Sequence, residues 1–178
     1  MNNLSNRKQI RIQDYDYATP GAYFITICSA NKANIFWNNV GADTIRPHNV
    51  PLSSIGQIVE QSILQIPKHY NHITVDKYCI MPNHIHLILQ IGADANGRMI
   101  SAPTVSTVIG SMKRWVSKQV GQSIWQKSFY DHGIRNQQDY NEIWNYIENN
   151  PLKYLMNRPV CRADNIRPYI KTSNRSNK

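Results

Sequence analysis

The fold is decided by the stretch Tyr78-Cys79-Ile80-Met81-Pro82-Asn83-His84-Ile85-His86-Leu87-Ile88-Leu89-Gln90. From His84 on, polar and apolar residues alternate, and this period of two is typical of a half-buried strand. Four apolar side chains of the run then share one face: Ile85, Leu87, Leu89 and Ile91. His84 and His86 share the other face, about 6.5 to 7 Å apart along the strand. The pattern predicts a strand that presents two imidazoles side by side.

Apolar periodicity and turn residues place the other elements around this strand. Strands are predicted at 21–28, 72–80, 84–91 and 123–134, and helices at 53–66, 104–120 and 136–149. Pro67 and Pro151 are expected to stop the first and last helices, and Asn136 is expected to cap the last one. The order β-α-β-β-α-β-α predicts an α+β, ferredoxin-like antiparallel sheet with helices on one face. The face that carries the two histidines is expected to stay open.

Composition limits the class of protein. The chain has 178 residues, 41% of them hydrophobic, which fits one folded domain. The sequence has no apolar run of transmembrane length and no signal-peptide core at its start, so we expect a soluble, cytoplasmic protein. Cys28, Cys79 and Cys161 are far apart and form no C-x-x-C pair. We therefore expect neither structural zinc nor a disulfide framework.

The charge balance favours a polyanionic partner, nucleic acid first. Twenty Lys and Arg face eleven Asp and Glu, which gives a net charge of +9. Charge alone fits a merely basic soluble protein equally well. Basic residues concentrate at both ends of the chain, so we divide it into a catalytic domain over 1–151 and a basic tail over 152–178.

Two imidazoles on an open sheet face can hold one metal ion, although a third ligand is usually needed. The last helix offers one, because Tyr146 and Asn150 are four residues apart and share a flank of its buried stripe. His84, His86 and the Asn150 oxygen would then hold a divalent cation, with Tyr146 within reach of a bound phosphate. The same spacing also fits an interpretation without a metal site. In that case the histidines are merely exposed, Tyr146 packs against the core and Asn150 caps the end of the helix.

A tyrosine at such a site suits phosphodiester chemistry. Attack by a phenolate gives a phosphotyrosine ester and frees a 3′-hydroxyl, so the bond energy is kept for rejoining. A phenol, with a pKa near 10, ionises more readily than an alcohol. The cation would polarise the phosphoryl oxygens and offset developing charge.

These residues carry a resemblance. The chain resembles the REP-associated tyrosine transposases, a bacterial branch of the single-tyrosine HUH transposases. The matching stretches occur in family order at 17–26, 81–86, 109–113, 125–135 and 146–151. Met-Pro-Asn-His-x-His combined with Tyr-Ile-x-x-Asn-Pro is a specific signature.

The resemblance implies a fold, an activity and roles. The fold is that of HUH endonucleases. The activity is nicking and joining of single-stranded DNA at hairpins formed by REP sequences, through a 5′-phosphotyrosine intermediate. His84 and His86 match the metal-binding pair, Tyr146 the nucleophile and Asn150 the third ligand, with Mg²⁺ or Mn²⁺ as the ion. The protein would be cytoplasmic and nucleoid-associated, away from membranes. Transposon relatives are dimers with sites completed in trans; for this branch a monomer is favoured and a dimer is the alternative.

Three alternatives stay open. Tyr130, beside Asp131 and His132, competes as nucleophile, but its i+4 residue is Ile134, which cannot bind a metal. We prefer Tyr146 on this geometry and on the family match. The same residues also fit a hydrolytic metallonuclease in which water attacks, or a hairpin-binding protein without catalysis.

Cationic and aromatic residues outside this site are candidates for DNA contact, because positive charge holds phosphates and aromatic rings stack bases. They are Lys113, Arg114 and Trp115 on the second predicted helix, and Lys127, His132 and Arg135 around the fourth predicted strand. A solvated helix face explains the first three equally well.

Overall fold

A computed structural model describes residues 20–38, 52–92 and 104–156. Along the chain the elements are β1 (Gly21–Cys28), the 3₁₀ turn η1 (Ala30–Lys32), α1 (Ser54–His69), β2 (Ile73–Ile80), β3 (His84–Ile91), α2 (Val105–Val120), β4 (Tyr130–Ile134) and α3 (Gln137–Met156). This is the predicted order, with β1 and β3 at their predicted bounds and a short 3₁₀ turn added.

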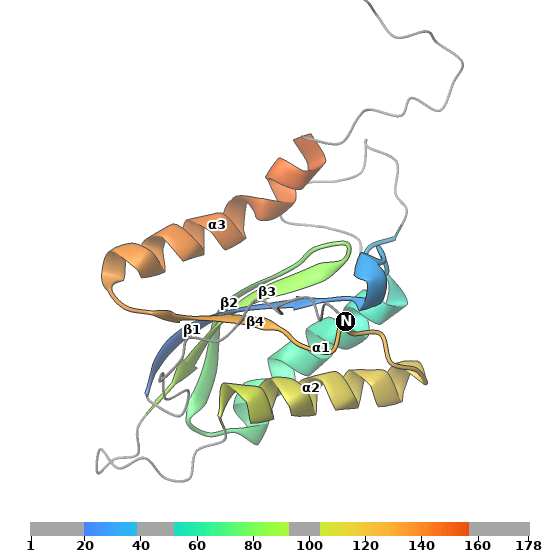
Figure 1. Ribbon diagram of the computed structural model, residues 1–178, viewed down its shortest axis with the longest axis horizontal. Helices are drawn as coiled ribbons and strands as arrows, with labels where there is room; N and C mark the ends of the chain where they lie inside the picture. The colour runs from blue at the N-terminus through green and yellow to red at the C-terminus, as the bar shows by residue number, and fades with distance from the viewer. Residues whose placement is uncertain (1–19, 39–51, 93–103, 157–178) are drawn as a thin grey trace, which may run out of the picture.

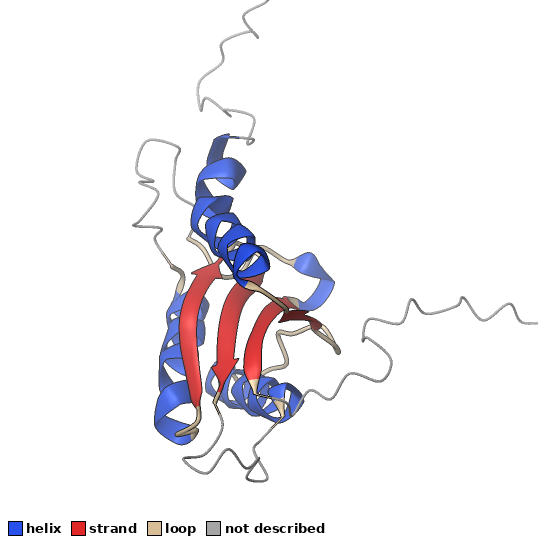
Figure 2. Ribbon diagram, turned by 90° about the vertical axis from the view of Figure 1, so that its left-hand side faces the viewer, coloured by secondary structure: helices blue, strands red, loops and turns tan. Residues whose placement is uncertain are grey.

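The strands form one antiparallel sheet in the order β2-β3-β1-β4. This is the ferredoxin-like arrangement, so the predicted fold class is confirmed. Figure 1 shows α1 and α2 on one face of the sheet and α3 on the other, and Figure 2 shows the strands side by side. The expectation that the second face would stay open is therefore wrong. The amphipathic stripe of α3 packs there, since it has apolar surface to bury.

The main core lies between the sheet and the two crossover helices. Ile85, Leu87 and Leu89 of β3 are fully buried, as the alternation predicts. The helix residues predicted to point inward in α2 are also its buried residues: Val105, Val108, Ile109, Met112 and Val116. Burial of such side chains is worth roughly 1.5–3 kcal/mol each, so this core fixes which face of β3 is left for His84 and His86.

Both proline-based helix ends are wrong. α1 continues through Pro67 to His69, and α3 continues through Pro151 to Met156. A proline removes one backbone N–H bond and crowds the carbonyl four residues earlier. In α1 this happens in the last turn, where the Tyr70 N–H still reaches the Ile66 oxygen at 3.0 Å. In α3 the Pro151 ring is buried, and this burial offsets part of the loss.

The fourth strand is shorter than predicted. Within the expected 123–134, only Tyr130–Ile134 forms β4, and Trp125 makes an isolated bridge to Ser29. The Gln126 N–H donates to the Cys28 carbonyl at 2.9 Å. The following carbonyls are held by Lys113 of α2 instead of by the sheet. The chain therefore leaves the ladder between this bridge and β4.

Several predictions lie outside the described residues. They concern the basic residues near the N-terminus, Cys161, and the part of the basic tail beyond Met156. Cys28 and Cys79, which are described, are free thiols. Among the helices of the described ranges, none combines the length and apolar character needed to cross a membrane.

Candidate active site

The two histidines of β3 meet on the sheet face below α3. His84 Nε2 and His86 Nε2 lie 3.1 Å apart, and the ring planes are inclined by 75° with centroids 4.6 Å apart. His86 is 4% exposed, and His84 is half-buried. The alternation of β3 thus brings two imidazole nitrogens to one point.

The far nitrogen of each ring contacts a side-chain oxygen. His84 Nδ1 donates to Asn83 Oδ1 at 2.7 Å, and His86 Nδ1 lies 2.8 Å from the Thr26 hydroxyl. With both Nδ1 atoms protonated, the Nε2 lone pairs face each other, an arrangement that a cation between them would stabilise. Contacts of this kind fix the tautomer and ring orientation of metal-binding histidines.

Burial keeps both imidazoles neutral. Desolvation, with a smaller effect of the His84 charge, lowers the pKa of His86 to about 3. Desolvation and then the charge of Lys32 lower the pKa of His84 as well. Because the neutral ring is the form that binds a metal, the site is ready for an ion at neutral pH without losing protons.

Tyr146 of α3 stands over the pair. Its hydroxyl donates to His86 Nε2 at 3.3 Å, and its ring meets that of His86 at 66° with centroids 5.2 Å apart. Phe24 of β1 stacks on His86 at 5.3 Å and meets the Tyr146 ring edge-on at 6.1 Å. Tyr146 is nevertheless 45% exposed. A substrate can therefore reach the phenol while the imidazole beneath it stays buried.

Asn150 lies one turn beyond Tyr146 and is half-buried. Its Nδ2 is buried and has no hydrogen-bond partner among the described residues. Those residues also contain no cluster of three His, Cys, Asp or Glu side chains that could hold a metal. An amide can present its oxygen instead of its nitrogen after a half-turn. The two imidazoles and this unsatisfied amide fit an ion that takes nitrogen and oxygen ligands.

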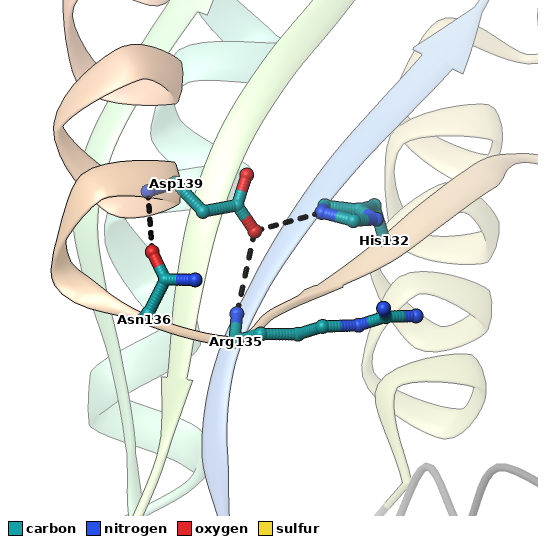
Figure 3. A network of polar contacts seen from close by, with 4 residues as sticks. All are labelled: His132, Arg135, Asn136 and Asp139. Carbon is teal, nitrogen blue, oxygen red and sulfur yellow. Dashed lines mark hydrogen bonds and ion pairs between the residues drawn. The ribbon is translucent and has the colours of Figure 1, made fainter.

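The start of α3 is tied to β4 by the network in Figure 3. The Asn136 Oδ1 accepts from the Asp139 N–H at 2.9 Å, which confirms the predicted cap. Asp139 Oδ2 reaches back to the Arg135 N–H at 3.3 Å and to His132 Nε2 at 2.9 Å. The hydrogen bond from His132 is the main cause of a lowered pKa for Asp139.

β2 holds the middle of α3. The Tyr140 hydroxyl donates to Asp76 Oδ2 at 2.9 Å, where a bulge interrupts the pairing of β2 with β3. Lys77 pairs with Glu148 and lies 4.8 Å from the centre of the Trp144 ring. These contacts lie on both sides of Tyr146 in sequence, so they set its height above the histidines.

The six predicted DNA-contact residues fall into separate places. His132 shares the sheet face of His86, because Phe24 and Thr26 of β1 pair with them in register. In Figure 3 the Arg135 side chain extends away from the network around Asp139. The other four residues, Lys113, Arg114, Trp115 and Lys127, belong to α2 and the segment beside it. DNA contact by any of the six stays a prediction.

Lys113 also has a structural role that the sequence does not show. Its ammonium donates to the Gln126 carbonyl at 2.6 Å and to the Lys127 carbonyl at 3.3 Å, and burial lowers its pKa. Trp115, 40% exposed, lies instead in a groove between α1 and α2. The predicted basic-aromatic cluster is therefore divided between two sides of α2.

Tyr130, the competing nucleophile, lies on the same sheet face as the histidines. It pairs with Thr26, which in turn pairs with His86, so one strand separates Tyr130 from His86. Strands are about 4.8 Å apart. Tyr130 is 48% exposed, nearly the same as Tyr146, so exposure does not choose between them. The contact of Tyr146 with His86 favours Tyr146, and the identity of the nucleophile stays a prediction.

Sequence reasoning missed Thr26, Asn83 and Phe24 as parts of the site. Asn83 precedes His84 in the quoted motif, and its position in a tight connection was a usable signal. Thr26 and Phe24 lie opposite β3, and their role depends on the register of β1 with β3. That register cannot be read from either strand alone.

Comparison with known proteins finds relatives of the chain. No protein-family model matches the chain. An uncharacterized protein of Haemophilus influenzae is 30% identical over 168 residues, which cover 84% of this chain and 90% of that protein. A protein of the same organism named as a putative REP-associated tyrosine transposase is 25% identical over 150 residues, covering 78% and 74%.

A solved structure has the same fold. It is that of a REP-associated tyrosine transposase bound to a REP hairpin, with a TM-score of 0.56 and 20% identity over 80% of this chain and 74% of that one. The chain is thus similar to proteins named REP-associated tyrosine transposases. The resemblance seen in the motifs is thereby confirmed, and these relatives support a DNA-processing enzyme at the general level.

Proposed function

We propose that this protein is a metal-dependent endonuclease and strand transferase. It nicks and joins single-stranded DNA at REP-like hairpins through a covalent 5′-phosphotyrosine intermediate on Tyr146. One observation carries the proposal: the Tyr146 hydroxyl lies 3.3 Å from His86 Nε2, which lies 3.1 Å from His84 Nε2. A reactive oxygen and two metal-binding nitrogens thus converge on an accessible point.

The chemistry assigned to Tyr146 is a transesterification. The phenolic oxygen attacks the phosphorus of a phosphodiester, its proton passes to the water that reaches this exposed side chain, and a P–O bond to tyrosine forms. The P–O3′ bond breaks, and the departing oxygen takes a proton from water to become a free 3′-hydroxyl. Because one phosphate ester replaces another, the reverse attack by a 3′-hydroxyl rejoins the strand without an energy source.

His84, His86 and Asn150 are the residues that would hold Mg²⁺ or Mn²⁺. Metal–nitrogen bonds in proteins are about 2 Å long, so an ion can contact both imidazole nitrogens across their 3.1 Å separation. Nitrogen ligands suit Mn²⁺, whereas Mg²⁺ prefers oxygen. When bound, the cation would polarise the phosphoryl oxygens and stabilise charge as the reaction proceeds. Thr26 and Asn83 would orient the imidazoles from behind.

Hairpin DNA is the proposed partner for two reasons. The chain carries a net charge of +9, and a polyanion is the matching ligand. The solved relative with the same fold is bound to a REP hairpin. We propose a monomer, since Tyr146 and His86 of one chain already meet.

The test is trapping of the covalent adduct. A hairpin oligonucleotide with a single-stranded flank is incubated with the protein and Mn²⁺ or Mg²⁺, then run on a denaturing gel. A label at the 3′ end should move with the protein, and a label at the 5′ end should appear on a released fragment that a polymerase can extend. Tyr146→Phe should lose the adduct and keep hairpin binding, whereas the equally exposed control Tyr130→Phe should keep both.

Other outcomes separate the alternatives. Cleavage that survives Tyr146→Phe without any adduct would indicate a hydrolytic metallonuclease. Hairpin binding by the wild-type protein without cleavage at any metal concentration would indicate a binding protein that lacks catalysis. If Tyr130→Phe loses the adduct and Tyr146→Phe retains it, the nucleophile is Tyr130 of β4.

A further inference from the structure

A second candidate site lies between α2 and the segment that leads to β4. We call it the α2 groove, and its main residues are Gly110, Lys113, Arg114 and Ser117 of α2 with Trp125 and Lys127 of the segment. α2 covers the face of the sheet opposite α3 (Figure 1). The sheet therefore separates the α2 groove from Tyr146, and the proposed transesterification does not use it.

The α2 groove is positively charged. Three of its described lining residues are cationic and none is acidic. Lys113 uses two of its three ammonium protons on the carbonyls of Gln126 and Lys127, which leaves one donor. Arg114 Nη2 donates to the Ser111 hydroxyl at 3.1 Å, and a guanidinium has five donors in all. Several charged donors therefore remain for a ligand.

A glycine lies beside Arg114 in this groove. A Cβ atom at Gly110 would lie 3.6 Å from Arg114 Nη1, at ordinary contact distance. The Arg114 guanidinium thus lies beside the backbone of α2 at residue 110. Because residue 110 is glycine, no side chain there covers the guanidinium. A planar guanidinium in such a position matches phosphate through paired N–H donors.

Trp125 supplies an independent indication of a ligand. Trp125 is one of the lining residues and is 6% exposed. Its indole Nε1–H is buried with no hydrogen-bond partner among the described residues. A buried N–H without an acceptor is unfavourable. Trp37 shows the usual solution, because its Nε1–H donates to the Ile80 carbonyl at 2.7 Å. Trp125 has no such acceptor among the described residues.

We infer that the α2 groove binds a phosphate group of the nucleic acid strand that the protein holds. The inference rests on the proposed function in taking DNA as the ligand. Arg114, Lys127 and the remaining Lys113 proton supply positive donors, and Trp125 is a lining residue beside them. Contacts of this kind position the strand and carry no base specificity. Free phosphate has the same chemistry, so the experiment must separate the two sources.

The test uses Tyr146→Phe protein, so that binding is measured without cleavage. The dissociation constant for a hairpin with a single-stranded flank is measured against salt concentration for Arg114→Gln, Lys127→Gln and Lys118→Gln. Lys118 is the matched control, because it is an exposed cation of α2 outside the groove. Loss of a phosphate contact should weaken binding about tenfold at 0.1 M salt and lower the salt slope by about 0.7–0.9. Lys118→Gln should change binding less than about twofold.

A second measurement follows the indole N–H signals by ¹⁵N–¹H NMR, with Trp125→Phe identifying the Trp125 signal. Adding the hairpin should shift the Trp125 signal. The Trp37 signal should stay unchanged, because its N–H already donates to the Ile80 carbonyl. Equal losses in all three charge variants would contradict the proposal, as would a Trp125 signal that moves with inorganic phosphate and ignores DNA. Neither readout involves cleavage, so failure of the adduct assay and failure of this inference are distinguishable.

Discussion

Side-chain oxygens behind the two imidazoles decide whether His84 and His86 can act together. Thr26 lies on a neighbouring strand and Asn83 on the preceding connection, yet each contacts an Nδ1 atom within 2.8 Å. Each contact leaves the corresponding Nε2 facing the other ring. The geometry of the imidazole pair is thus determined by side chains that contact the opposite nitrogen of each ring.

Thr26→Val should weaken Mn²⁺ binding about 10- to 100-fold, which is the usual loss when a residue behind a metal-binding histidine is removed. Valine keeps the shape of threonine in the strand and removes the hydroxyl that faces His86 Nδ1. Isothermal titration calorimetry measures the change without relying on activity. Thr74→Val in β2 is the control, because the Thr74 hydroxyl contacts Asp76 and not a histidine. Equal affinities for wild type and Thr26→Val would refute a role for this hydroxyl.

The stability of the metal-free protein should depend on pH through His86. Its folded pKa is lowered to about 3, mainly by burial, whereas an unfolded histidine titrates near 6.5. Between these values the unfolded state binds more protons, so the free energy of unfolding falls as pH falls below about 6.5. Above that pH the contribution is fully present.

Urea denaturation with a chelator at pH 7.5, 6.5, 5.5 and 5.0 checks this dependence. His86→Gln removes the titrating group, and its stability should fall less steeply than that of wild type, by up to about 1.4 kcal/mol per pH unit. Parallel curves for the two proteins would mean that folding does not lower the pKa of His86.

At the scale of elements, the position of α3 decides the distance from Tyr146 to His86. Few α3 residues are buried, so polar contacts carry much of its attachment. The cap at Asn136 and the carboxylate of Asp139 fix its start against β4. The link from Tyr140 to Asp76 fixes the next turn against β2.

Asn136→Ala should lower the free energy of unfolding by about 1 kcal/mol, because it removes the acceptor for the Asp139 N–H. It should also lower the rate of adduct formation, since the helix that carries Tyr146 frays from that end. Chemical denaturation and single-turnover kinetics measure the two effects. Gln138→Ala, at an exposed position of the first turn, should cost less than about 0.5 kcal/mol. An equal cost for both substitutions would show that the cap does not anchor α3.

Local pattern was enough for some elements and not for others. The alternation in β3 and the apolar face of α2 follow directly from burial, so their bounds and inward residues were predictable. The helix ends predicted at Pro67 and Pro151 were wrong, because a helix tolerates one lost hydrogen bond where packing or a nearby helix end offsets it. The segment before β4 resembles a strand in composition, but its carbonyls bond to Lys113, a tertiary contact invisible in local sequence.

The same distinction holds for the site. His84, His86, Tyr146 and Asn150 were predictable because fixed spacings on one strand and one helix bring each pair together. That α3 would cross the histidine face, rather than leave it open, depended on how its stripe and polar contacts pack against β2. Thr26 and Phe24 required the register of β1. Residue spacing in the sequence does not predict such long-range packing.

At the scale of the whole molecule, one chain brings together the described parts of the site. β1 supplies Thr26 and Phe24, β3 the histidines and α3 the tyrosine. A monomer should therefore be active. Mixing His86→Ala protein with Tyr146→Phe protein, each inactive alone, should not restore adduct formation at any ratio. Recovery of activity in the mixture would show that Tyr146 of one chain works with the histidines of another.

The most direct measurement is to locate the DNA on the protein. The covalent adduct is trapped with Mn²⁺, the DNA is trimmed with nuclease, and tryptic peptides are sequenced by mass spectrometry. Cleavage after Arg135 and Lys153 releases residues 136–153, and cleavage after Lys127 and Arg135 releases residues 128–135. We expect the nucleotide mass on Tyr146 within the first peptide. Its presence on Tyr130 in the second peptide, or on Tyr140, would contradict the assignment of Tyr146 as the nucleophile.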